Sequence, residues 1–132
     1  MGQREDIPDL TRAFDLAIVN SRAEPFGLTV VEAMASGTPV LATAVDGIRE
    51  IIEHGQTGWL VRSGEYQELV QGIELLLADK RLRKRLSMSA LTTVRSLFAA
   101  ESFISNLEKL YPAFRWLPHL IKRPTHKNSK SN

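Results

Sequence analysis

Two patterns in this sequence predict an α/β fold, with a parallel sheet flanked by helices and a helical C-terminal segment after it. Between residues 15 and 61, short apolar runs of strand length alternate with segments of helical periodicity, and the connections are short. This alternation is typical of parallel sheets that carry helices on both faces. From Tyr66 onward, apolar residues recur only at helical spacing, so the rest of the chain is predicted to be helical.

Strands and helices can be assigned in order along the first half of the chain. The central helix is expected over residues 27–36, where a polar loop precedes it and Gly37 follows as a C-terminal cap. A second helix is expected over 47–54, because three isoleucines repeat there at helical spacing. The expected strands are 15–20, 38–43 and 59–61, and a short helix over 8–14 precedes them.

Three apolar stripes define the helical segment that follows. The third stripe, over residues 101–111, is expected to end at Pro112, which cannot continue a helix. The stripes comprise Leu69, Ile73, Leu76 and Leu77; then Leu82, Leu86 and Leu91; then Phe103, Ile104, Leu107 and Leu110.

Length and composition are those of one globular domain. The chain has 132 residues, 43% of them hydrophobic and 24% charged, and it has no cysteine, which excludes disulfides and thiolate metal sites. No apolar run approaches the ~20 residues of a membrane-spanning helix, and the polar, acidic N-terminus does not look like a secretory signal. A cytoplasmic location is therefore expected.

Positive charge is concentrated at the C-terminal end. Residues 115–132 carry five basic residues and no acid, so they contribute +5 to a net charge of +2 and leave −3 for the remainder. We expect residues 112–132 to form a solvated, disordered tail; attachment to an anionic membrane surface or to nucleic acid is the alternative. The basic run 80–85 keeps helical spacing through its leucines, which favours a solvated helix face over a nucleic-acid patch. No nucleic-acid partner is expected.

Two carboxylates flank the start of the central helix. Glu24 lies in the preceding loop and Glu32 lies inside the helix, eight positions later, so the two can occupy different depths along one wall. Between them, the backbone N–H groups of Phe26, Gly27 and Leu28 lie where a helix start has free donors and the positive end of its dipole. A helix start of this kind binds anions. The stretch therefore predicts a site for a phosphorylated, sugar-bearing ligand.

The same residues also have purely structural interpretations. Glu24 taken alone is equally consistent with a surface acid near a helix N-terminus, an interaction worth about 0.3–1 kcal/mol. Glu32 lies amid apolar neighbours, so its carboxylate needs either a partner or a cleft.

Two loops are expected to lie together at the ligand site. Residues 21–26 and 44–47 each follow a predicted strand. The carboxyl ends of parallel strands share one edge of a sheet, and ligands of such sheets bind at that edge. We therefore expect the two loops to meet there.

The glutamates belong to a longer pattern made of three strings. These are EPFGL at 24–28, EAMASGTPV at 32–40 and GWLV at 58–61, and the first two form an E-x7-E motif. Together the strings resemble the C-terminal half of family 4 retaining glycosyltransferases, which have the GT-B fold. The resemblance extends from Gly2 to about Tyr111. It implies a partial Rossmann-like domain over residues 1–111 that binds a nucleotide sugar.

The resemblance implies a role for each residue of the donor site. Glu24 would contact hydroxyls of the transferred sugar as the catalytic glutamate, and Glu32 would bind the nucleotide ribose. Backbone amides of residues 26–28 would hold the distal phosphate or the sugar, and Arg4 would lie beside the base. The implied reaction transfers a hexose from a nucleotide-diphosphate sugar to a glycan or lipid-linked acceptor, with retention at the anomeric carbon. It needs no metal or other cofactor.

Complete enzymes of the family contain more than this chain. They have an N-terminal acceptor domain, and their C-terminal domain opens with further βα units that would precede Gly2. We therefore expect the chain to need a missing domain or a partner chain, with weak peripheral attachment to the cytoplasmic membrane face as one setting for glycan biosynthesis. The alternative is a truncated, non-catalytic remnant that binds nucleotide sugars without transferring them. Asp46 and Gly47 stand where the family often has two glycines, so a carboxylate is expected near the phosphates.

Overall fold

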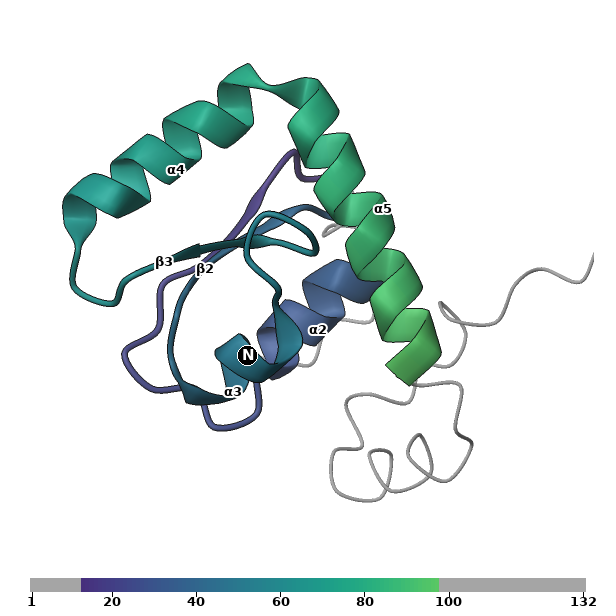
Figure 1. Cartoon of the computed structure of the whole chain (residues 1–132), viewed down its shortest axis with the longest axis horizontal. Helices are drawn as coiled ribbons and strands as arrows, with labels where there is room; N and C mark the ends of the chain where they lie inside the picture. The colour runs from purple at the N-terminus through teal and green to yellow at the C-terminus, as the bar shows by residue number, and fades with distance from the viewer. Residues whose placement is uncertain (1–12, 98–132) are drawn as a thin grey trace, which may run out of the picture.

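The computed structural model describes residues 13–97, and at its centre lies a three-stranded parallel sheet (Figure 1). The strands lie in the order β1-β2-β3, and β2 is hydrogen-bonded to both others, with Ile18 of β1 opposite Leu41 of β2. The predicted parallel sheet is therefore confirmed. Its strands are β1 (Ala17–Val19), β2 (Val40–Thr43) and β3 (Trp59–Val61).

Helices follow each strand, as the alternating pattern predicts, although several elements are shorter than expected. Of the helix expected over 8–14, residues 13 and 14 are not helical, and residues 8–12 lie outside the described residues. Arg4, the segment 101–111 and the tail 112–132 lie outside the described residues. Within the described part of the chain, no helix has both the length and the apolar character to cross a bilayer. The helices are α2 (Leu28–Ala35), α3 (Asp46–Ile51), α4 (Tyr66–Ala78) and α5 (Lys80–Leu97).

The central strand β2 supplies core residues to both faces of the sheet. Val40 and Ala42 belong to a buried cluster with residues of α2, α3 and the second half of α5. Leu41 belongs to a second cluster, with Leu76 of α4 and Leu86 of α5. Side chains alternate along a strand, which explains this division. Helix α5 therefore contributes to the core on both sides, and it packs against both α2 and α4 (Figure 1).

Helix α2 ends in a Schellman motif that turns the chain toward β2. Gly37 has a φ of 75°, in the left-handed region that favours glycine. Its N–H donates to the carbonyl of Met34, and the N–H of Thr38 donates to the carbonyl of Ala33, both at 3.1 Å. These bonds satisfy carbonyls that a helix end leaves free. The predicted role of Gly37 as the C-terminal cap is therefore confirmed.

Arg83 connects α5 to the end of α4. Its Nη1 donates to the carbonyl oxygens of Leu76 and Leu77 at 2.5 and 2.7 Å, and its side chain is only 13% exposed. A cation here also complements the negative end of the α4 dipole. Leu77, which the sequence predicts to pack in the apolar stripe, has a 55% exposed side chain, so that prediction is wrong. The neighbouring Leu76 faces the sheet, and successive residues of a helix point about 100° apart.

Replacing Arg83 by alanine is expected to lower the free energy of unfolding by about 1–3 kcal/mol, because two carbonyls lose a charged donor. Urea unfolding followed by circular dichroism measures this change. Arg81→Ala is the matched control, since Arg81 is exposed on the same helix and has no partner within residues 13–97. The control should change the free energy by less than about 0.5 kcal/mol. Equal losses in the two variants would contradict the capping role.

Candidate functional site

The loops that follow β1 and β2 meet at the carboxyl edge of the sheet. Gly47, in the first turn of α3, donates its N–H to the carbonyl oxygen of Glu24 at 3.2 Å. A Cβ atom at Gly47 would lie 2.5 Å from the carbonyl oxygen of Pro25, so the contact leaves no room for a side chain. The predicted meeting of the two loops is therefore confirmed, and it depends on a glycine at position 47.

Thr43, the last residue of β2, fixes the loop that follows β1. Its hydroxyl accepts a hydrogen bond from the N–H of Ser21 at 3.0 Å and donates one to the carbonyl of Ser21 at 2.6 Å. Thr43 is only 2% exposed, so water does not compete freely for these bonds. The loop that carries Glu24 is therefore held at two points. The side chain of Thr43 binds the backbone of Ser21, and the N–H of Gly47 binds the carbonyl of Glu24.

The carboxylate of Glu24 lies at the start of α2. Its Oε1 accepts a hydrogen bond from the N–H of Gly27 at 3.3 Å, and the helix has no side-chain cap. Gly27 has a φ of 62°, so the chain enters the helix through the left-handed conformation. The Glu24 carboxylate therefore accepts a bond from the N–H of Gly27, which is one of the backbone donors that the sequence analysis assigns to a ligand phosphate.

The side chain of Glu32 lines a groove that the loop of Glu24 does not line. It lines a largely apolar groove of about 480 Å³, together with β1 and with Phe14 and Thr29, and Glu24 does not line that groove. The Glu32 carboxylate has no hydrogen bond or ion pair within residues 13–97, and burial raises its pKa. The two glutamates are therefore close in the sequence but line separate surfaces. The sequence analysis requires either a partner or a cleft for the Glu32 carboxylate, and this groove is the cleft.

The other predicted residues occupy varied environments. The side chain of Phe26 is 60% exposed, whereas Leu28 is half-buried against the core. Asp46 is exposed in the first turn of α3. Arg4 lies outside the described residues. Among residues 13–97, no three metal-ligating side chains are grouped to hold a metal ion.

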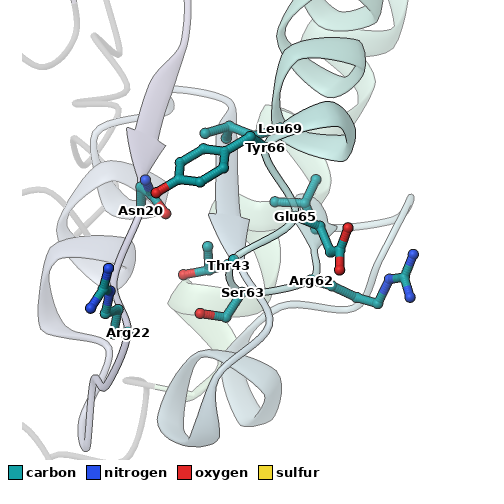
Figure 2. Close-up of a pocket in the computed structure, with 10 residues that line it drawn as sticks. Asn20, Arg22, Thr43, Arg62, Ser63, Glu65, Tyr66 and Leu69 are labelled. Atoms are coloured by element: carbon teal, nitrogen blue, oxygen red, sulfur yellow. The ribbon is translucent and has the colours of Figure 1, made fainter.

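A second recess at the carboxyl edge is not predicted by the sequence analysis. It has a volume of about 420 Å³ and lies between the loop after β1 and the turn after β3 (Figure 2). In the sequence, polar residues directly follow the segments that form β1 and β3, and this pattern could have indicated a site. Only the fold shows that these residues lie together. The lining includes Asn20, Arg22, Thr43, Ser63, Tyr66 and Leu69.

Comparison with known proteins identifies the class to which this fold and site belong. Residues 1–92 match the family model described as "Glycosyl transferases group 1". The N-acetyl-alpha-D-glucosaminyl L-malate synthase of Bacillus anthracis is 34% identical over 111 residues, which are 84% of this chain and 29% of that protein. The chain therefore belongs to the group 1 glycosyltransferases.

Solved structures agree with this assignment. HepE of Anabaena, solved in complex with UDP, superposes with a TM-score of 0.70 and 33% identity over 80% of this chain and 30% of that one. Sucrose-phosphate synthase from Thermosynechococcus elongatus gives a TM-score of 0.69 and 35% identity over 78% of this chain and 26% of that one. The predicted likeness to the C-terminal domain of GT-B glycosyltransferases is confirmed. The chain spans less than a third of the length of these proteins.

Replacing Gly47 by alanine is expected to lower the free energy of unfolding by about 1–3 kcal/mol, as overpacking does, because a methyl group collides with the Glu24 loop. It should also shift the backbone amide resonances of Glu24 and Phe26 in ¹H–¹⁵N NMR spectra. Glu50→Ala, an exposed position on the same helix, is the control and should leave those resonances in place. Unmoved loop resonances in Gly47→Ala would show that the contact does not position the loop.

The charge of Glu32 is expected to make the fold less stable at neutral pH. Burial raises its pKa above the unfolded value near 4.5, so folding favours the protonated carboxyl. Its contribution to stability is fully present below the unfolded pKa and is lost as the pH rises through the folded pKa. Glu32→Gln should therefore raise the Tm at about pH 7 by roughly 2–4 °C, a figure discounted for partial exposure.

Differential scanning calorimetry at about pH 7 and about pH 4 measures this effect. The gain in Glu32→Gln should shrink at the lower pH, where the native carboxyl is itself largely protonated. A Tm that falls in the variant at neutral pH would mean that the carboxylate is stabilised by a partner.

Proposed function

We propose that this chain is the donor-binding part of a glycosyltransferase that transfers a hexose from a nucleotide-diphosphate sugar, with retention at the anomeric carbon. Membership of the group 1 family supports sugar transfer, and the complex of the similar HepE with UDP supports a nucleotide-sugar donor. The observation that carries the proposal is the hydrogen bond from the N–H of Gly27 to the carboxylate of Glu24. This bond supports a role for the start of α2 in binding negatively charged oxygen.

The donor would contact both glutamates and the backbone amides that lie between them. Glu24 would exchange its 3.3 Å bond for hydroxyls of the transferred sugar, and backbone amides of residues 26–28 would take the distal phosphate. Glu32 would accept bonds from the ribose hydroxyls, because its carboxylate has no partner within residues 13–97. The apolar walls of its groove suit the flat face of a base, beside which we expect Arg4.

The transfer exchanges one bond at the anomeric carbon for another. The bond to the diphosphate oxygen breaks, a bond to an acceptor hydroxyl oxygen forms on the same face, and the hydroxyl proton passes to the departing diphosphate. Negative charge develops on the diphosphate in an oxocarbenium-like transition state. The dipole and the backbone N–H groups at the start of α2 would stabilise that charge, so we propose that no metal takes part.

A second domain or a partner chain would supply the rest of the enzyme, including further contacts to the diphosphate and to a glycan or lipid-linked acceptor. Two observations support this part of the proposal. The chain spans 29% of the similar N-acetyl-alpha-D-glucosaminyl L-malate synthase and 30% of HepE. Within residues 13–97, the outer side of β1 faces the Glu32 groove and has no neighbouring strand.

That open edge also favours a second candidate function, which is nucleotide-sugar binding without transfer. A chain in which residues 13–97 supply no strand beyond β1 could keep the Glu24 loop and α2 without the groups that promote departure of the diphosphate. Incubation with UDP-glucose distinguishes the two functions. A transferase with its partner present releases UDP in the presence of an acceptor, whereas a binding module keeps the donor intact.

Calorimetric titration with UDP and UDP-glucose tests the donor site. We expect saturable binding that Glu32→Ala weakens by about 1–3 kcal/mol, because hydrogen bonds to a charged group are lost. Glu74→Ala is the matched control, since Glu74 is an exposed glutamate on α4 without a partner in the described chain. The control should bind like the native chain. Folded protein that binds neither nucleotide would exclude a functional donor site in this chain.

A further inference from the structure

The side chain of Thr43 continues the connection between β1 and β2 beyond their last paired residues. The ladder of these two strands ends with Val19 opposite Ala42, so Thr43 is the first residue of β2 beyond that pairing. Its hydroxyl lies 3.4 Å from the carbonyl oxygen of Val19, but its closer contacts are the two backbone groups of Ser21. A side chain of the central strand therefore holds the chain at the point where it leaves the sheet.

Threonine combines the two properties that this position requires. Its β-branched side chain suits a strand, and its hydroxyl can donate and accept at the same time. Valine would keep the shape of the side chain, but both backbone groups of Ser21 would lose a partner. The hydroxyl of Thr43 therefore has a role that its packing does not explain.

The second anchor of the loop lies three residues further along the chain, where the carbonyl of Glu24 accepts the N–H of Gly47 at 3.2 Å. With both anchors, the segment 21–24 has its ends fixed to β2 and to α3. With one anchor, the segment can pivot about the other. The direction in which the side chain of Glu24 leaves the loop therefore depends on Thr43, which Figure 2 shows at the end of β2 beside the loop that carries Arg22.

The groove that Glu32 lines is held by other contacts. Its walls are formed by residues of β1 and α2 together with Phe14, and none of residues 20–27 lines it. Helix α2 carries Glu32 and is fixed by buried residues such as Val30 and Met34. Its first turn is held as well, because the backbone of Gly27 packs so closely on Ile51 of α3 that a Cβ atom would collide. Removing the Thr43 hydroxyl therefore leaves this groove and the start of α2 in place.

We propose that Thr43 is a positioning residue for the transferred sugar, which it orients through Glu24, and that the nucleotide is held independently of it through Glu32. This inference rests on the proposed function, in which Glu24 contacts hydroxyls of the sugar and Glu32 contacts the ribose. Two separately anchored parts of the chain then recognise the two halves of the donor. Loss of the Thr43 hydroxyl weakens the sugar contacts and spares the nucleotide contacts.

Calorimetric titration of the full chain with UDP and with UDP-glucose tests this inference. Thr43→Val should weaken binding of UDP-glucose by about fivefold or more, because hydrogen bonds to a charged group are misaligned. Binding of UDP, which lacks the transferred sugar, should change by less than about twofold. In ¹H–¹⁵N NMR spectra, the variant should shift the amide resonances of Ala23 and Glu24 and leave that of Glu32 in place. Equal weakening of the two ligands, or unmoved resonances of Ala23 and Glu24, overturns the inference.

Two control variants separate positioning from a general loss of stability. Thr43→Ser keeps the hydroxyl and should bind both ligands within about twofold of the native chain. Thr57→Val removes another buried threonine hydroxyl, which accepts the N–H of Glu53 at 2.9 Å just before β3, at the opposite edge of the sheet. It should lower the Tm and leave both affinities unchanged. A selective loss of UDP-glucose binding in Thr57→Val would show that destabilisation alone produces the effect.

A double-mutant cycle shows whether Thr43 acts through Glu24. In a Glu24→Ala background, Thr43→Val should weaken UDP-glucose by less than about twofold further, because the contact that Thr43 orients is already absent. Losses that add in full would overturn the inference.

The native chain distinguishes this inference from the proposed function on which it rests. Folded native protein that binds neither ligand removes the proposed function, and the inference with it. Native binding of both ligands, with Thr43→Val weakening them equally, keeps the donor site and removes only the role of Thr43.

Discussion

The pair of hydrogen bonds between the Thr43 hydroxyl and Ser21 is the interaction on which the loop at the carboxyl edge of the sheet depends. Buried at the end of the central strand, the hydroxyl bonds to the N–H and the carbonyl of Ser21 and so holds the loop after β1 against the sheet. A hydroxyl can do this because it both donates and accepts, and valine of similar shape would leave two backbone groups with lost partners. From that anchor, Arg22 is presented on one side and Glu24 is carried toward the start of α2.

Under the proposed function, Glu32 and Gly47 are the positions where ligand binding would constrain the stability of this fold. Glu32 keeps an unpaired, half-buried carboxylate beside apolar residues, although its raised pKa shows that burial disfavours the charge. Gly47 keeps a backbone without a side chain inside a helix, where alanine would be the better helix former. Neither choice improves packing. Both are understandable if the edge of the sheet must present a free carboxylate and a closely docked loop to a ligand.

The sequence predicts the order of elements well, because alternating apolar runs and glycine caps are local signals. Gly37 and the three strands follow from such signals, whereas the exposure of Leu77 does not, since periodicity alone cannot say which of two adjacent leucines meets the sheet. The E-x7-E spacing locates both glutamates, but it does not indicate that Glu32 lines a groove which Glu24 does not line. Arg83 appears in the sequence as one of five bases in a solvated run, yet its guanidinium caps α4. Those outcomes depend on contacts between distant segments, which spacing does not encode.

The loop of residues 20–27 joins the carboxyl edge of the sheet to the start of α2. Ser21 is bonded to the hydroxyl of Thr43, and the carbonyl of Glu24 accepts the N–H of Gly47, so the loop is fixed at two points to β2 and α3. Arg22 lies between these two points and lines the recess at the carboxyl ends of the strands, while the carboxylate of Glu24 lies at the start of α2. The Glu32 groove is lined by β1 and α2 and by none of these loop residues. A substitution at either anchor is therefore expected to move Arg22 and Glu24 together without reshaping the Glu32 groove, because the groove has its own walls.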